Sequence, residues 1–430
     1  MNKTSEPLAA QARTLAKQGD WDGARTKLLQ LVTEVIGTQA KDLKINRDQY
    51  SLNSLNGLTE LADGRRFFFK YHNEEGEDNT IEEYYNAELL RDAGYCVDVP
   101  LYACGEPGRQ ILFYTLREDS RLADVCRAVE EQRNWHGMAP VVKAQDDYDK
   151  DALKVAIRTL KWGAVEDVVK EPVHQLFHHR LVTEGERIGL GGRVGRNYVG
   201  KHFTFPGCDV DWSILKDLKW VVNGVEYERT LEELFLESGE VLAPANLAAH
   251  GVVTAHGDAH NANVWYEFKD GTPHLVSFDP AFAGRNIPAL IAEVKATFHN
   301  IFAHPLWLYE PARIEQEYKV SARIDGGRIF IDFDWTISPL REAFLESKTE
   351  RYWKPLISEL ASNGWLPGNW ERIVRLALFC CPTLVLDLRA GGISGHTPHS
   401  SALGLAVAVC AGSEPVAGSD WFSRMFAAIQ

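Results

Sequence analysis

The sequence predicts an α+β protein with a small antiparallel sheet in its first part and a larger, mainly helical second part. Strand-like segments separated by turn residues crowd between residues 42 and 118, whereas apolar rows at helical spacing dominate after Arg323. A chain of 430 residues is long enough for two or three domains. We expect a helical extension over residues 1–42, a sheet-containing domain over 43–118 and a helical domain over 119–430.

Composition and charge exclude several classes of protein. The 46 basic and 60 acidic residues give a net charge of −14, so a nucleic-acid partner is not expected. The seven cysteines are odd in number and form no C-x-x-C pair, which argues against a disulfide framework or a zinc ribbon. The N-terminus lacks the apolar core of a signal peptide, and the longest apolar stretch, 402–411, is too short to span a membrane. We expect a cytoplasmic protein with no membrane association and no obligate protein partner.

Local signals place the elements of the first 118 residues. Residues 5–36 carry apolar side chains at helical spacing and predict two helices, interrupted at Gly19-Asp20. Asp63-Gly64 lies between two strand-like runs and is a hairpin signal, and Gly94 is a helix stop. The other elements predicted in this part are a polar loop over 51–57, strands over 58–61 and 65–71, a helix over 80–93, and short strands over 99–103 and 110–116.

Residues from about 120 to 250 form an insert of mixed pattern. The glycines from Gly189 to Gly195 depart from the G-x-G-x-x-G spacing, which favours a flexible surface loop over a dinucleotide site. Apolar rows over 340–361 and 372–388 predict a packed helical bundle, with Cys380 and Cys381 in its core. The insert contains an acidic stretch over 146–151, a helical run over 152–169 and a Gly/Arg/His-rich segment over 174–202.

The segment from Val252 to Ala292 concentrates polar residues suited to chemistry. An apolar strand runs into His256-Gly-Asp258, Asn263 follows five residues after Asp258, and a predicted hairpin ends on Asp279. Two carboxylates and a carboxamide oxygen are hard ligands that suit Mg²⁺ rather than zinc. We therefore expect Asp258, Asn263 and Asp279 to form a magnesium-dependent site.

These residues resemble the aminoglycoside phosphotransferase and choline kinase-like superfamily, which shares the two-lobed fold of the protein kinases. The match is HGD-x-H-x-x-N from His256 to Asn263, followed by Asp279 at a strand end. The resemblance implies that Asp258 is the catalytic base and that Asn263 and Asp279 hold Mg²⁺ on the phosphates of ATP. It also implies that His256 organises the loop, and we expect His260 to stabilise it by hydrogen bonding.

The same resemblance assigns roles in the sheet-containing domain. Lys70 ends the strand FFFK and is expected to bind the phosphates, held by Glu88 of the next helix; Glu82 and Glu83 are alternatives. The loop from Asn53 to Gly57 is expected to cover the phosphates with its backbone N–H groups. The remaining nucleotide-binding candidates are Ser54, Asn56 and Gly57 in that loop and Thr115, Leu116 and Arg117 at the adenine.

The function implied is that of an ATP- and Mg²⁺-dependent kinase that phosphorylates a hydroxyl group of a small molecule. Three alternatives stay open: a nucleotide-binding pseudokinase, a kinase fold that catalyses another transfer such as nucleotidylation, and a metal-dependent hydrolase. The hydrolase alternative rests on His256-x-Asp258-x-His260, whose spacing resembles part of a metallohydrolase site.

A basic group in the insert suggests the kind of acceptor. The segment from residue 180 to residue 201 contains three more Arg and Lys residues than Asp and Glu residues, in a chain of net charge −14. Arginine forks suit carboxylates and phosphates, so Arg193 and Arg196 are candidate residues of an anionic-substrate pocket. The alternative is that these arginines are solvated or pair with the acidic stretch over 146–151.

Overall fold

The computed structural model describes residues 7–46, 54–72, 80–106, 109–303, 308 and 310–430, with the backbone alone at 54, 72 and 80–85. Contacts divide the chain into two compact units. The first contains Met1–Ser120 and Val276–Ala281, and the second contains Arg121–Leu275 and Phe282–Gln430. One unit is built on an antiparallel sheet and the other is mainly helical, so the predicted α+β class is confirmed. Among the described residues, no helix combines the length and apolar character needed to cross a bilayer.

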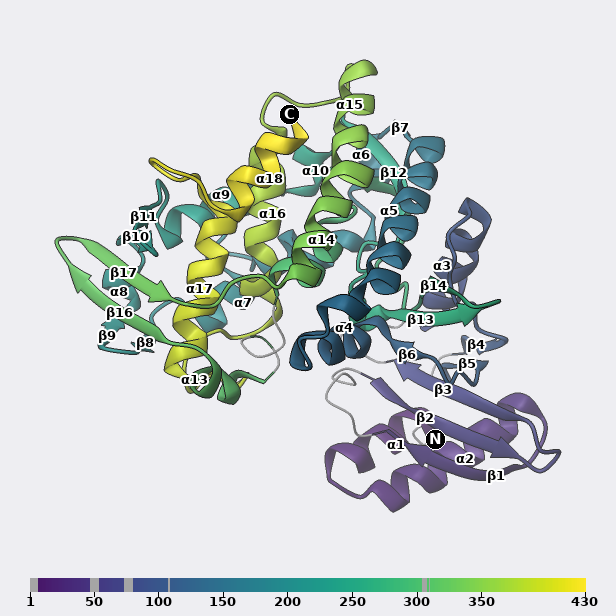
Figure 1. Cartoon of the computed structure of the whole chain (residues 1–430). Coiled ribbons are helices and arrows are strands. Elements are labelled where there is room, and N and C mark those ends of the chain that lie inside the picture. Colours follow the sequence, from purple (N-terminus) through teal and green to yellow (C-terminus); the bar gives the residue numbers. More distant parts are fainter. Residues whose placement is uncertain (1–6, 47–53, 73–79, 107–108, 304–307, 309) are drawn as a thin grey trace. The chain divides into compact units, whose positions relative to one another are not determined.

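A five-stranded antiparallel sheet of order β1-β2-β3-β5-β4 forms the first unit (Figure 1). Alternate residues of the central strand, Phe67, Phe69 and Tyr71, are buried against the two N-terminal helices. The predicted N-terminal extension thus shares the core of the sheet. The elements are α1 (Leu8–Lys17), α2 (Trp21–Ile36), β1 (Ala40–Ile45), β2 (Ser54–Leu61), β3 (Arg66–His72), α3 (Thr80–Ala93), β4 (Tyr102–Cys104) and β5 (Ile111–Thr115).

Strand β2 begins earlier than predicted. The polar loop expected over 51–57 is strand from Ser54 onward, because this segment pairs with β1 on one side and with β3 on the other. A side chain at Gly57 would place its Cβ 1.9 Å from the carbonyl oxygen of Lys44. Gly57 therefore serves the close approach of two strands, and Asn53 lies outside the described residues.

A short segment from the middle of the chain completes the first unit. The Ser277 amide donates a hydrogen bond to the Cys96 carbonyl oxygen (3.0 Å), and the Asp98 amide donates one to the Ser277 carbonyl oxygen (2.8 Å). The Ser277 hydroxyl also donates to the Cys96 carbonyl oxygen (3.1 Å). This parallel bridge brings Asp279, two residues later, into the unit that contains Lys70.

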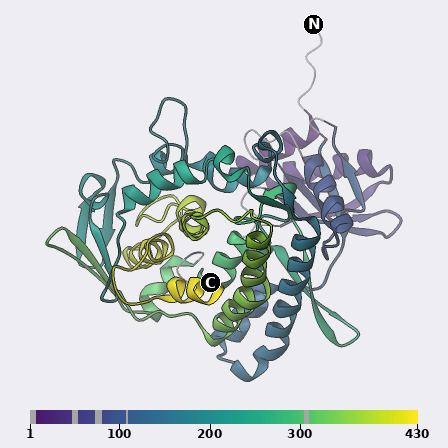
Figure 2. The same cartoon turned by 90° about the horizontal axis from the view of Figure 1, so that it is seen from above.

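The core of the second unit lies around α16 (Trp370–Val385) and α17 (Pro398–Gly412), which pack side by side in Figures 1 and 2. Cys380 and Cys381 are buried in α16, as predicted. The other α-helices are α4 (Leu122–Glu131), α5 (Ala139–Thr159), α6 (Val165–Val168), α7 (Gly192–Asn197), α8 (Trp212–Leu215), α9 (Leu231–Val241), α10 (Pro244–Leu247), α11 (Val294–Thr297), α13 (Ile314–Glu317), α14 (Pro339–Ser347), α15 (Lys354–Ser362) and α18 (Trp421–Ile429). The 3-10 helices are η1 (Trp135–Met138), η2 (Pro172–Leu176), η3 (His178–Arg180), η4 (Asn261–Asn263) and η6 (Pro311–Arg313), and the π-helices are η5 (Phe298–Phe302) and η7 (Lys348–Trp353).

The region expected to be an insert, residues 120 to 250, shares sheets with later parts of this unit. Strand β10 pairs in parallel with β17, and β7 pairs with β12, so residues near 162 and 220 share sheets with later parts of the chain. The predicted helical run over 152–169 is found instead at 139–159, and a β-hairpin precedes the helices after residue 320. The remaining strands are β6 (Ser120–Arg121), β7 (Lys161–Trp162), β8 (His202–Phe205), β9 (Cys208–Asp211), β10 (Lys219–Val222), β11 (Val225–Glu226), β12 (Gly251–Ala255), β13 (Val264–Lys269), β14 (Thr272–Ser277), β15 (Gly284–Pro288), β16 (Val320–Asp325) and β17 (Arg328–Phe333).

Three charged side chains are buried together in the helical core. The Lys348 ammonium lies 2.6 Å from a carboxylate oxygen of Asp149 and 2.9 Å from one of Glu293, and each side chain is at most 3% exposed. The Asp149 carboxylate also accepts hydrogen bonds from Ser347 and Gln145, both at 2.8 Å. A single ammonium thus balances two carboxylates that water does not reach.

Candidate active site

The segment around Asp258 follows a fully buried strand. Strand β12 is buried along its whole length and ends at Ala255, and His256 is 1% exposed. The Asp258 amide donates a hydrogen bond to His256 Nδ1 (3.3 Å). At Gly257, φ is +78° and a Cβ would lie 2.7 Å from the Phe282 carbonyl oxygen, so the turn favours glycine. His256 and Gly257 therefore fix the backbone that presents Asp258.

The next residues form a short loop, which we call the Asp258 loop (residues 256–263). The Asn263 side-chain amide donates to the Asp258 carbonyl oxygen (3.1 Å), and the Asn261 amide donates to the side chain of Asn300 (2.7 Å). His260 caps the turn η4 by accepting a hydrogen bond from Ala262 (3.3 Å). The loop is thus held at both ends before any ligand binds.

The Asp258 carboxylate accepts no hydrogen bond from the described residues. Its Oδ1 is buried, and lies 3.9 Å from His260 Nε2 and 4.0 Å from the Lys295 ammonium. Because Oδ1 is shielded and the side chain is 14% exposed, Oδ2 is the oxygen open to a substrate hydroxyl. A carboxylate with a cation behind it and an open oxygen in front can accept a proton.

Lys295 is a site residue that the sequence patterns do not predict. Burial lowers the pKa of its ammonium, whereas the nearby Asp258 carboxylate raises it. The ammonium donates to Nε2 of His299 (2.9 Å), whose pKa burial holds well below its usual range, so the imidazole is neutral. The available signal is a single charged residue in the segment from Val294 to Phe298.

The second cluster, in the first unit, joins Lys70 and Asp279. The Lys70 ammonium, on the central strand β3, lies 2.5 Å from Asp279 Oδ1, and the Lys70 side chain is 9% exposed. The φ of Asp279 is +58°, a left-handed conformation that costs a non-glycine residue about 1–2 kcal/mol. The sequence prediction places both residues in a phosphate and metal site, and the structure brings them into direct contact.

Asn263 and Asp279 have suitable donor atoms for a magnesium ion. The Asn263 nitrogen is engaged by the Asp258 carbonyl oxygen, which leaves its Oδ1 as a ligand atom. The Asp279 carboxylate already contacts a cationic group and is 31% exposed. These are hard oxygen donors of the kind that Mg²⁺ prefers. Within the described ranges, no three His, Cys, Asp or Glu side chains form a metal-binding group.

The other nucleotide-binding candidates have local roles that the structure defines. Glu88 forms an ion pair with Arg91 on its own helix (3.5 Å), and the side chains of Glu82 and Glu83 lie outside the described atoms, as does that of Ser54. Asn56 is buried in β2 and accepts a hydrogen bond from Asn46 (3.1 Å). At the end of β5, Thr115 is exposed and Leu116 half-buried, and Arg117 pairs with Asp98 (3.0 Å) and Asp119 (3.1 Å).

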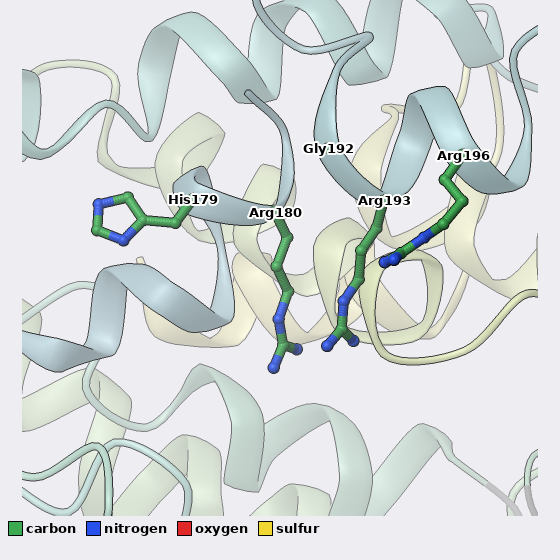
Figure 3. A pocket seen from close by; sticks show the side chains of 5 residues that line it. All are labelled: His179, Arg180, Gly192, Arg193 and Arg196. Atoms are coloured by element: carbon green, nitrogen blue, oxygen red, sulfur yellow. The ribbon is translucent and has the colours of Figure 1, made fainter. Parts of the chain in front are cut away.

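The two arginines predicted to bind substrate line one cavity. Arg193 and Arg196 border a cavity of about 290 Å³ together with His179, Arg180 and Gly192, which we call the arginine pocket (Figure 3). A short helix, α7, opens at Gly192 where a loop is expected. In the acidic stretch over 146–151, Asp146 pairs with Arg351 (2.7 Å) and Asp151 pairs with Lys154 (2.8 Å).

These elements define a two-lobed, kinase-like fold. A lysine lies on the central strand of an antiparallel sheet, one helix follows that strand, and the mainly helical unit carries the Asp258 loop. The sequence motifs predict this class of protein.

Comparison with known proteins finds similar structures but no similar sequences. No protein-family model matches the chain, and no curated protein matches it by sequence. The chain is similar to a candidate fructosamine-3-kinase from Thermobifida fusca, at 13% identity and a TM-score of 0.41, over 89% of this chain and 98% of that one. It is also similar to a type I macrolide 2′-phosphotransferase (14%, TM-score 0.36, 79% and 96% covered). A macrolide 2′-phosphotransferase from Brachybacterium faecium is a third (15%, TM-score 0.33, 82% and 97% covered).

Proposed function

We propose that the protein is an ATP- and Mg²⁺-dependent small-molecule kinase that transfers the γ-phosphoryl group of ATP to a hydroxyl group. One observation carries the proposal: the Asp258 carboxylate has an open oxygen, accepts no hydrogen bond from the described residues, and is backed by the buried ammonium of Lys295. A group placed in this way suits proton transfer from a hydroxyl. Its loop follows the HGD-x-H-x-x-N pattern.

In the proposed reaction, Asp258 orients the acceptor hydroxyl and takes its proton. The hydroxyl oxygen forms a bond to the γ-phosphorus, and the bond from that phosphorus to the bridging oxygen breaks, which releases ADP. Lys70 binds the nucleotide phosphates through its ammonium, and the Lys295 ammonium lies behind the Asp258 carboxylate, 4.0 Å from its Oδ1. Asn263 and Asp279 would hold Mg²⁺, which supplies charge neutralisation on the phosphates.

The experiment that tests the function is a screen of ATP consumption with product analysis by mass. Sugars, amino alcohols, nucleosides and aminoglycosides are offered as acceptors, and the products are weighed for added phosphate or added nucleotide. A gain of one phosphate supports the kinase. A gain of a nucleotide would replace it by a nucleotidyl transferase, and nucleotide binding with no product across the screen would favour a pseudokinase.

Replacing Asp279 with alanine should abolish Mg²⁺-dependent nucleotide binding. At a hundred-fold excess over its Kd, Mg·ATP stabilises a binding protein by about 2.7 kcal/mol, and we expect most of this to be lost in Asp279→Ala. The measurement is the shift in melting temperature caused by ATP with Mg²⁺ and by ATP with a chelator. Asp92→Ala, a surface carboxylate of the same unit, is the matched control and should keep the full shift. An undiminished Mg·ATP shift in Asp279→Ala would place the metal on other residues.

A further inference from the structure

The arginine pocket has a lining suited to one class of ligand. Three of its five described lining residues are arginines and none is acidic, in a chain whose net charge is −14. Figure 3 shows the side chains of Arg180 and Arg193 extending in the same direction, with Arg196 reaching toward Arg193 and His179 pointing away. Guanidinium groups present planar forks of N–H donors that match carboxylate and phosphate oxygens.

The pocket and the segment that carries Lys295 both contact the same helix, α16. Arg193 donates to the Leu384 carbonyl oxygen (2.8 Å) near the end of α16. One turn earlier, the Cys381 sulfur lies 4.0 Å from the carbonyl oxygen of Val294, the residue before Lys295. The Lys295 ammonium lies in turn 4.0 Å from Asp258 Oδ1. Contacts within one compact unit therefore connect the arginines to the carboxylate.

Electrostatics supports this proximity. The positive charges of Arg180 and Arg193 contribute to lowering the pKa of Lys295, although burial is the largest cause. Arg180 and Lys295 both favour the thiolate of Cys381, whose pKa burial raises to about 12. The arginines are thus near enough for their fields to reach the groups around Asp258.

We propose that the acceptor substrate is an anion, and that Arg180, Arg193 and Arg196 bind a phosphate or carboxylate group of that acceptor while Asp258 acts on its hydroxyl. This inference rests on the proposed kinase function. The cavity of about 290 Å³ has room for a phosphate or carboxylate group. Arg180 joins the two arginines named from the sequence, because η3 brings it beside α7.

Arg193 also supports the fold, and the test must separate this role from binding. Its Nη1 donates to the Leu384 and Val385 carbonyl oxygens at the end of α16. Both of these bonds use the same nitrogen of a guanidinium that carries five N–H donors. We therefore test binding with Arg180→Gln/Arg196→Gln and use Arg193→Lys, which keeps the charge and removes the fork. Arg187→Gln is the matched control, because Arg187 is an exposed arginine of the same segment and is not a lining residue.

The first measurement is the affinity of inorganic phosphate for the full-length protein, from melting shifts or calorimetry at constant ionic strength. Each charge-assisted contact is worth about ten- to a hundred-fold in affinity. We expect Arg180→Gln/Arg196→Gln to weaken phosphate binding at least ten-fold, Arg193→Lys to weaken it less, and Arg187→Gln to leave it unchanged. Absence of phosphate binding to the native protein, or equal binding in all variants, would overturn the proposal.

The second measurement compares acceptors that differ only in charge: a sugar, its monophosphate and the corresponding sugar acid. We expect an anionic form to have a KM at least ten-fold lower than the neutral sugar, and Arg180→Gln/Arg196→Gln to remove this preference while the KM for ATP stays constant. A rise in the KM for ATP alone would assign the pocket to the nucleotide and overturn the acceptor assignment. Efficient transfer to neutral acceptors only would also overturn it and leave the kinase intact. Arginine-dependent phosphate binding without any ATP-dependent transfer would instead contradict the kinase function.

Discussion

Asp258→Asn is expected to lower the rate of phosphoryl transfer by about 10²- to 10⁴-fold, the usual contribution of a general base. Asparagine has nearly the same shape, and the loop hydrogen bonds of residue 258 use its backbone amide and carbonyl groups, so the fold should be unchanged. Binding of Mg·ATP should be retained, because Lys70 and Asp279 lie in the first unit and are untouched. The measurement is kcat with a saturating acceptor, alongside the Mg·ATP melting shift.

A control separates the loss of the base from a general effect of losing a carboxylate. Asp151→Asn removes an exposed carboxylate of α5 that pairs with Lys154, and it should keep the native kcat. An Asp258→Asn protein that retained more than half of the native kcat would show that another group accepts the proton. Loss of both kcat and Mg·ATP binding would also contradict the separation of roles.

Lys348→Met is expected to destabilise the protein by about 3–5 kcal/mol, the cost of leaving buried charge uncompensated. Methionine keeps much of the volume, so the loss arises chiefly from Asp149 and Glu293, whose carboxylates remain in the core. Burial already raises the pKa of Asp149 in the native protein, and loss of the ammonium raises it further. The deficit should therefore shrink as the pH falls from neutrality toward the unfolded-state pKa, because the protonated carboxyl needs no counter-charge.

Urea unfolding followed by tryptophan fluorescence measures this effect at neutral and at mildly acidic pH. Lys354→Met is the matched control: it removes an exposed lysine six residues away, whose ion pair with Glu350 spans 3.6 Å, and should cost at most about 1 kcal/mol. Equal midpoints for the two variants would show that the buried carboxylates find compensation elsewhere.

The parts of the fold that the sequence predicts well are those with local signals. Helix α3 has the predicted bounds because Gly94 stops it, and β3 follows the Asp63-Gly64 turn as expected. Strand from Ser54 to Gly57 was not predictable in this way, because its polar residues become strand through pairing on both edges. The pairing of β10 with β17 was not predictable either, because about a hundred residues separate the two strands and no local pattern connects them.

In the candidate site, too, some residues have a signal in the sequence and others do not. Lys70, Asp258, Asn263 and Asp279 are the candidates that recognisable spacing in the sequence supplies. Lys295 and Arg180 belong to no motif, because their proximity to Asp258 and to Arg193 arises from helices and turns that only the folded chain brings together. The choice among Glu82, Glu83 and Glu88 as the partner of Lys70 stays a prediction, and the ion pair that the structure defines for Glu88 is with Arg91.

The bridge between Ser277 and Cys96 has a consequence for synthesis on the ribosome. The first unit needs Val276–Ala281, which is made only after the whole stretch Arg121–Leu275 has been translated. At about 5–20 residues per second, this delay lasts about 8–30 s. During that interval the segment at Cys96–Asp98 lacks its hydrogen-bond partner Ser277, and Lys70 emerges before the carboxylate of Asp279 exists. The nucleotide-binding half of the proposed enzyme is therefore completed after translation has passed residue 281, not when its own 120 residues leave the ribosome.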